Sequence, residues 1–141
     1  MNDLVPDPLP PSLDAARAGR VIDAIRASWS EEIAIMPERW SVERRATGHC
    51  DVSSIAFWDE FGGEMVLSQV FVDDELSEHH WSNRIDGVDI DLTRSQFFGH
   101  EDIRVVEVYG PDEIARRRRE FRPEVLGRSD RFNESVAAQL G

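Results

Sequence analysis

The chain contains a single cysteine, Cys50, and the residues around it suit nucleophilic chemistry. Apolar residues between Val52 and Trp58 predict a helix that begins near Cys50, and Gly62-Gly63 predict where it ends. A helix N-terminus carries unpaired backbone N–H groups and the positive end of the helix dipole. Both favour a negative charge, so we expect Cys50 to lie where a thiolate is stabilised.

A predicted β-hairpin follows downstream. Asp86-Gly87 separates two short alternating runs, His79 to Ile85 and Val88 to Thr93, which is typical of a two-residue hairpin turn. The expected cross-strand pairs are Ile85 with Val88, Arg84 with Asp89, Asn83 with Ile90, Ser82 with Asp91, Trp81 with Leu92 and His80 with Thr93. The apolar face of this hairpin is expected to be buried.

The other face of the hairpin brings a histidine and a carboxylate together. His80 and Asp91 are diagonal neighbours on it, roughly 7 Å apart at the backbone and within side-chain reach. His79 points to the opposite face, and Asp89 lies nearer the turn, where Arg84 can pair with it. The geometry therefore favours His80 as the base and Asp91 as its partner.

These residues form the parts of an activated cysteine nucleophile. His80 would take the proton of the Cys50 thiol and later donate it to the leaving group, and Asp91 would orient the imidazole. The backbone N–H of Cys50 would be one oxyanion donor, and the side chain of His49 could be a second.

The same residues carry a resemblance to a known family. The motifs are Trp29-Ser30, Gly48-His49-Cys50, Phe61-Gly62-Gly63-Glu64, His80-Trp81, Asn83-Arg84-Ile85-Asp86-Gly87, Asp91-Leu92-Thr93 and Gln96-Phe97. Their order and spacing resemble the YunG-type family of small bacterial proteins from roughly Val21 to Phe97, with weaker similarity from Arg131 to Leu140. That pattern is in turn similar to compact papain-like (NlpC/P60-like) cysteine hydrolases and to transglutaminase-like folds.

The resemblance implies Cys50 as nucleophile, His80 as base and Asp91 as orienting acid. The supporting residues that we expect around them are His49, Trp81, Ser82 and Asn83. The family usually has Gln at the position of His49, and that Gln would be the natural oxyanion donor. The family itself implies no substrate. From the triad we expect a small cysteine hydrolase or acyltransferase that acts on an amide, thioester or related electrophilic carbon of a small molecule or peptide, without a cofactor or metal.

Two other interpretations stay open. A lone cysteine is more often a buried small apolar residue than a nucleophile, so the fold could instead be a non-catalytic binding module for a small molecule or protein. His49, Cys50, His79 and His80 could also bind zinc, although the predicted hairpin separates the last two and no Cys-x-x-Cys pair is present.

The remaining sequence predicts the elements that position these residues. Before the Cys50 helix, we expect a disordered Pro-rich tail from Met1 to Pro11 and a helix that is capped by Ser12 and reaches Trp29. Between that helix and the hairpin, we expect a central strand from Met65 to Val72 and an acidic loop from Asp73 to Glu78. After the hairpin, we expect a last strand from Ile103 to Tyr109 and two helices, from Pro111 to Leu126 and from Asp130 to Leu140, split by Gly127. These elements predict a single α+β domain over residues 12–141, and the resemblance implies that it is of the compact papain-like kind. Its N-terminal helices would pack on an antiparallel sheet of about four strands, with C-terminal helices after it.

The composition narrows the class of partner. The 141 residues include 16 basic and 28 acidic side chains, giving a formal net charge of -12. This charge argues against nucleic acid and anionic membranes as partners. Arg116 to Arg119 have Glu113, Glu120 and Glu124 within pairing distance along a helix, which predicts a solvated helix face. No apolar run is long enough to span a bilayer and no signal peptide is recognisable, so we expect a cytoplasmic protein.

Overall fold

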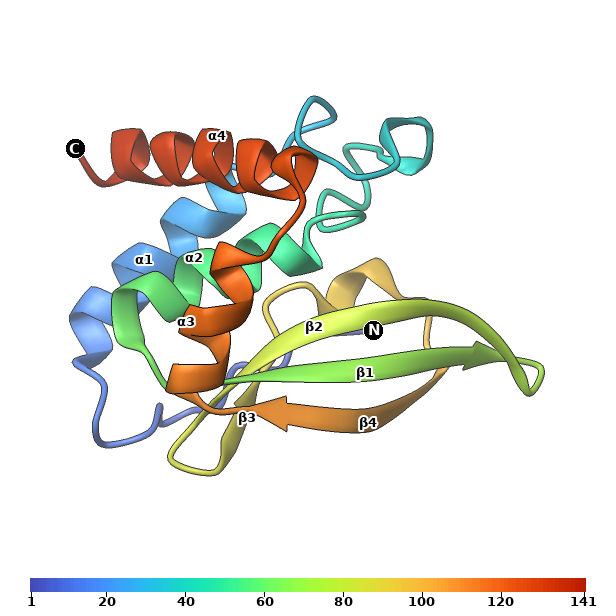
Figure 1. Ribbon diagram of the computed structural model, residues 1–141, viewed down its shortest axis with the longest axis horizontal. Coiled ribbons are helices and arrows are strands. Elements are labelled where there is room, and N and C mark those ends of the chain that lie inside the picture. Colours follow the sequence, from blue (N-terminus) through green and yellow to red (C-terminus); the bar gives the residue numbers. More distant parts are fainter.

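Four α-helices and a four-stranded antiparallel sheet build the α+β architecture of the computed structural model, which describes residues 1–141 (Figure 1). The helices are α1 (Ala15–Ala27), α2 (Cys50–Phe61), α3 (Pro111–Arg119) and α4 (Pro123–Leu140), with short 3-10 turns η1 (Pro37–Arg39) and η2 (Arg94–Gln96). The strands are β1 (Glu64–Val72), β2 (Glu75–Ile85), β3 (Val88–Ile90) and β4 (Asp102–Tyr109), in the sheet order β3-β2-β1-β4.

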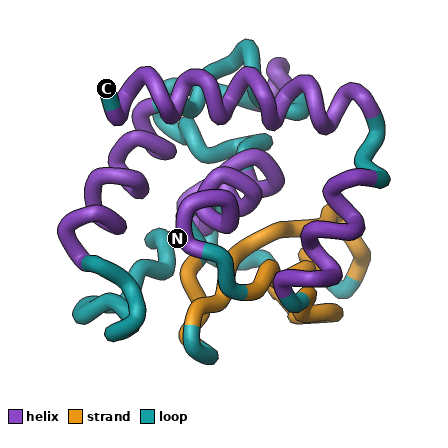
Figure 2. Tube along the Cα trace, turned by 60° about the vertical axis from the view of Figure 1, so that its left-hand side comes forward, coloured by secondary structure: helices purple, strands orange, loops and turns teal.

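The helices gather on one side of the sheet, with α2 in the middle of the helical layer (Figure 2). The main core lies between α1, α2, α4 and the β2–β3 end of the sheet, and Ile25, Phe57, Ile90 and Phe132 are completely buried in it. A smaller core joins α2 and α3 to β1 and β4 through Ile55, Met65, Tyr109 and Ile114. The Cys50 helix is therefore held by packing on most of its circumference.

Helix α1 begins two residues later than the sequence predicts. Asp14, not Ser12, is its N-cap, and one Asp14 carboxylate oxygen accepts the backbone N–H groups of Ala16 and Arg17 at 3.0 and 3.2 Å. A carboxylate caps and also offsets the positive end of the helix dipole. Ser12 instead donates its hydroxyl hydrogen to the carboxylate of Asp86.

The Asp86-Gly87 hairpin is confirmed in its turn and in its first three pairs. Asp86 and Gly87 have φ values of 52° and 76°, and β2 pairs with β3 from Ile85↔Val88 to Asn83↔Ile90. The expected pairs beyond Ile90 do not form, because β3 ends there and the chain turns into η2.

A second two-residue turn replaces the acidic loop expected from Asp73 to Glu78. Asp73 and Asp74 have φ values of 51° and 63°, and β2 already starts at Glu75. Aspartate tolerates the left-handed conformation better than most residues, so an Asp-Asp pair can make a hairpin turn without glycine.

The N-terminal residues, which the composition predicts to be a disordered tail, pair with the chain directly after β3. Leu4 and Asp91 exchange two backbone hydrogen bonds of 2.9 and 2.8 Å. The Asp3 carboxylate accepts the Ser95 N–H at 2.9 Å and pairs with Arg26 at 3.1 Å. The backbone groups of Asp91 and Ser95 thus provide partners for the N-terminal residues that composition alone does not reveal.

The C-terminal helices are divided at a different place than expected. The break lies between Arg119 and Pro123, whereas Gly127 is inside α4. Proline has no backbone N–H and disfavours a helical conformation in the residue before it, and Arg122 is accordingly extended, with φ −61° and ψ 149°. None of the helices combines the length and the apolar character needed to cross a membrane.

Candidate functional site

Cys50 is the first residue of α2, at the N-terminus that the sequence predicts for it. Gly48, two residues earlier, has a φ of 77°, and a Cβ atom there would lie 2.9 Å from the backbone nitrogen of Ile35. The Ile35 N–H donates to the Gly48 carbonyl at 3.2 Å. Glycine thus allows the loop before η1 to lie directly against the start of the Cys50 helix.

Arg128 of α4 stabilises the contact between the loop before η1 and the start of α2. Its guanidinium donates to the Asp51 carboxylate at 2.6 Å, to the Gly48 carbonyl at 3.0 Å and to the Ile33 carbonyl at 2.8 Å. No local sequence pattern marks Arg128 as a site residue, because its partners lie 77 to 95 residues away along the chain.

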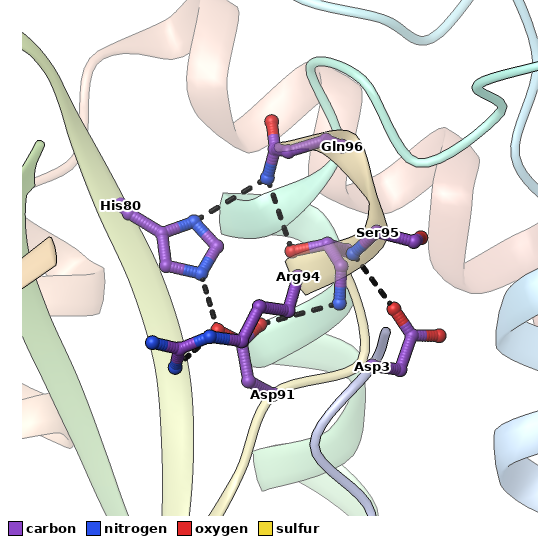
Figure 3. A network of polar contacts seen from close by, with 7 residues as sticks. Asp3, His80, Asp91, Arg94, Ser95 and Gln96 are labelled. Carbon is purple, nitrogen blue, oxygen red and sulfur yellow. Dashed lines mark hydrogen bonds and ion pairs between the residues drawn. The ribbon is translucent and has the colours of Figure 1, made fainter. Parts of the chain in front are cut away.

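His80 of β2 lies behind Cys50 with only 1% of its surface exposed. Its Nε2 atom donates to the Asp91 carboxylate at 2.7 Å, so the two residues that the hairpin geometry selects are in direct contact (Figure 3). Asp91 is 2% exposed, and its carboxylate also accepts the Thr93 N–H at 3.3 Å and pairs with Arg94 at 3.5 Å. The carboxylate is therefore fixed from several directions.

The charge state of His80 follows from these partners. Burial by itself lowers the pKa of His80, but the hydrogen bond to Asp91, together with hydrogen bonding and charge from Cys50, outweighs burial and raises the pKa to about 10. The imidazole is therefore protonated at neutral pH. Cys50 thus lies beside a buried positive charge that a carboxylate holds in place.

Gln96 is a site residue to which the sequence analysis assigns no role, although it belongs to the Gln96-Phe97 motif. Its side-chain nitrogen lies 3.3 Å from both His80 Nδ1 and the Thr93 hydroxyl (Figure 3). The amide can donate to a neutral imidazole or, turned over, accept from the imidazolium. The ring of Phe97 meets the His80 ring edge-on, with 5.0 Å between the ring centres. Residues Gln96 and Phe97 thus orient the imidazole from the side opposite Asp91.

His49 does not have the geometry of an oxyanion donor. It is 0% exposed, its Nδ1 atom donates to the Thr47 carbonyl at 2.9 Å, and its Nε2 atom accepts the Ser30 N–H at 3.1 Å. Burial is the main cause that lowers the pKa of His49, to about 4, so the ring is neutral. With both nitrogens occupied, His49 joins the loop before α2 to the end of α1 and has no free donor for a substrate.

The other expected supporting residues differ in their contacts. Asn83 donates to the Ser54 carbonyl at 3.1 Å and so ties β2 to α2. Ser82 is 9% exposed and lies opposite Val66 in the sheet. Trp81 packs against Tyr109 with 5.6 Å between ring centres and is the one member of this group that lines the cleft described below.

The residues considered for zinc are not assembled. His79 is exposed on the face of β2 opposite His80, and both nitrogens of His49 have backbone partners. No group of three or more His, Cys, Asp or Glu side chains is arranged to hold a metal ion.

A cleft of about 700 Å³ opens in front of Cys50. Its walls are formed by Ile35, Met36, Arg39, Arg44, Thr47, Gly48, Cys50, Asp51, Ser77, Glu78, His79, Trp81, Gln96, Phe97, Phe98 and Glu101. Partial burial raises the pKa of Glu78, and the charge of Glu101 adds to this, whereas His80 and Arg39 oppose it. A cleft of this volume holds a small molecule or a short peptide. His80 does not line the cleft, so a substrate would meet the thiol and the amide of Gln96 first.

The family model described as YunG protein matches residues 17–140, a range that includes Cys50, His80 and Asp91. No curated protein and no solved structure matches the chain.

Proposed function

The chain belongs to the YunG family, and we propose that it is a cysteine-dependent hydrolase or acyltransferase acting on an amide, thioester or related electrophilic carbon. One observation carries this proposal. Cys50 lies at the start of a helix, faces a cleft, and interacts with an imidazole that Asp91 keeps protonated. A thiolate beside an imidazolium is the resting form of an activated cysteine nucleophile.

The chemistry would proceed in two stages. The Cys50 sulfur attacks the carbonyl carbon, a C–S bond forms, and the carbonyl oxygen becomes an oxyanion. As the intermediate collapses, His80 gives its proton to the leaving group and an acyl-enzyme remains. In the second stage, water or another nucleophile attacks the acyl-enzyme while neutral His80 takes its proton. The C–S bond then breaks and the Cys50 thiolate is released. Asp91 stays ionised throughout and orients the ring.

Two donors are available for the oxyanion. As the first residue of α2, Cys50 has no intrahelical acceptor for its own backbone N–H. Gln96 lines the same cleft, and in the orientation that suits protonated His80 its carbonyl oxygen accepts from Nδ1, which turns its NH2 group away from the imidazole. We assign to this NH2 group the second donor role first expected of His49. A cysteine at a helix start, followed in the chain by the histidine and then the acid, is also the order of papain-like and transglutaminase-like enzymes, and we include that kinship in the proposal.

The experiment uses the fact that Cys50 is the only cysteine, so any thiol adduct reports on this site. Iodoacetamide should alkylate the intact protein at neutral pH faster than it alkylates free cysteine, as followed by mass spectrometry, and His80→Gln should slow the reaction. Hydrolysis of a simple thioester should be lost in Cys50→Ala while the thermal unfolding midpoint stays close to that of the wild type. An alkylation rate no higher than that of free cysteine, or full activity in Cys50→Ala, would falsify the proposal.

One observation favours a second candidate function, a non-catalytic binding module. His80 is 1% exposed and absent from the cleft wall, as expected if the Cys50, His80 and Asp91 cluster only stabilises the fold. In that case Cys50→Ser would leave ligand binding unchanged and no acyl-enzyme would form with any thioester. The partner would be a small molecule or a peptide able to enter the same cleft.

A further inference from the structure

The rim of the Cys50 cleft exposes large apolar side chains. Ile35, Met36 and Phe98 are 60%, 43% and 64% exposed, and all three line the cleft. Single exposed apolar residues are ordinary, but three that converge on a concave site next to a nucleophile mark a surface that a ligand covers. Trp81 and Phe97 continue the apolar surface deeper into the cleft.

This apolar rim is held in place on both sides. On one side, Ile35 is bonded through its N–H to the Gly48 carbonyl at 3.2 Å. On the other, Arg44 donates to the carbonyls of Ser95 and Phe97 at 3.0 and 3.3 Å, and its guanidinium stacks over the Phe98 ring at 3.7 Å from the ring centre. A rim that is ordered before binding loses little conformational entropy when a ligand covers it.

Most of the charged side chains in the cleft wall already have a partner. Asp51 is paired with Arg128, and the Glu101 carboxylate accepts the N–H groups of Phe98 and Gly99. Arg39 and Glu78 make no ion pair or hydrogen bond, but they are opposite in sign and close enough for Arg39 to lower the pKa of Glu78. Because these two groups are opposite in sign, together they favour neither sign of substrate charge, and the recognition surface that we assign beside Cys50 is the apolar one.

We propose that the cleft selects substrates whose acyl group is uncharged and carries a bulky aromatic or branched aliphatic part, which packs on Ile35, Met36 and Phe98 while its carbonyl carbon meets Cys50. The volume of about 700 Å³ accommodates one such group together with a small leaving group, and not a folded protein. This inference rests on the proposed function, because it names the substrate of the same thiol.

The test measures acylation of Cys50 by three thioesters with one common thiol leaving group, carrying an acetyl, a phenylacetyl or a glutaryl acyl part. Rates come from mass spectrometry of the intact protein and are divided by the rates of the same thioesters with free cysteine. Phenylacetyl should exceed acetyl by roughly tenfold or more, and glutaryl should not. Met36→Ser and Phe98→Ser should each reduce the phenylacetyl-to-acetyl ratio several-fold. Val42→Ser, at a residue that is 71% exposed and outside the cleft, is the matched control and should keep the wild-type ratio.

The outcomes separate the two proposals. Acylation of Cys50 that is faster than that of free cysteine supports the hydrolase proposal. The inference about the substrate is nevertheless wrong if the three relative rates are equal, if glutaryl is preferred, or if the rim variants leave the phenylacetyl-to-acetyl ratio unchanged. If no thioester acylates Cys50 faster than free cysteine, both are wrong. Thermal unfolding of each variant verifies that it is folded, since serine at exposed positions is expected to leave the core intact.

Discussion

Two buried histidines on either side of the Cys50 helix start have opposite charge states. His49 and His80 are 0% and 1% exposed, and both ring nitrogens of each have polar neighbours. Yet the pKa of His49 is lowered to about 4, whereas that of His80 is raised to about 10. Burial therefore does not by itself decide whether a histidine is charged.

The partners explain the difference. His49 contacts a backbone carbonyl and a backbone N–H, and the N–H can be accepted only by an unprotonated nitrogen. His80 interacts with the Asp91 carboxylate and with the Cys50 sulfur, and negative charge on either group favours the imidazolium. The first ring therefore serves to hold the loop before α2, and the second carries the charge that the proposed chemistry needs.

The largest expected effect comes from removing the charge next to His80. Asp91→Asn should lower the pKa of His80 and slow alkylation of Cys50 at neutral pH by about tenfold, because the imidazolium beside the sulfur loses the carboxylate that stabilises it. The pKa is measured by NMR titration of the imidazole C–H signals. The matched control is Asp89→Asn, because Asp89 pairs with Arg84 at 2.6 Å on the partly exposed hairpin and does not touch His80. Equal changes in the two variants would contradict the assignment.

A smaller effect should appear at His49 in acid. The pKa of about 4 lies below the ordinary value of 6.5, so the unfolded chain takes up the proton first as the pH falls. The stabilisation from neutral His49 is complete above about pH 6.5 and is lost as the pH falls towards 4, to a total of at most about 3 kcal/mol. Urea unfolding at several pH values measures it.

His49→Gln sharpens the comparison, since glutamine offers one acceptor and one donor as neutral histidine does, and does not titrate. This variant should fold with a free energy of unfolding within about 1 kcal/mol of the wild type near pH 7, and should lack the loss between pH 6.5 and 4. The same acid sensitivity in both proteins would show that another group causes it.

The smallest effect is expected at the N-terminal segment. Asp3→Asn weakens the ion pair with Arg26, and Asp3 also accepts the Ser95 N–H next to Gln96. We expect a loss of about 1 kcal/mol or less in the free energy of unfolding and a measurable decrease in the pKa of His80, because the segment that holds Asp91 and Gln96 becomes less fixed. Asp23→Asn, at an exposed residue of α1, should change neither quantity. A stability loss with an unchanged His80 titration would mean that Asp3 has no positioning role.

The sequence by itself was sufficient for the features that depend on near neighbours. The helix start at Cys50 follows from the apolar spacing after it, and the turn at Asp86-Gly87 sets the first hairpin pairs, because turn type and register are properties of a few adjacent residues. The choice of His80 over His79 follows from the alternation of side chains along a strand. The choice of Asp91 over Asp89 follows from the place of Asp89 near the turn, where it pairs with Arg84.

Tertiary structure alone decided what those residues meet. The neutral state of His49, the bonds of Arg128 across more than 70 residues of sequence, the contact of Gln96 with His80 and the pairing of Leu4 with Asp91 all join segments whose proximity no local pattern reveals. Hydrogen-bond partners and burial determine the charge of a side chain, and both arise only when distant segments pack together. The sequence therefore predicts which residues form this site, whereas the fold determines their protonation states.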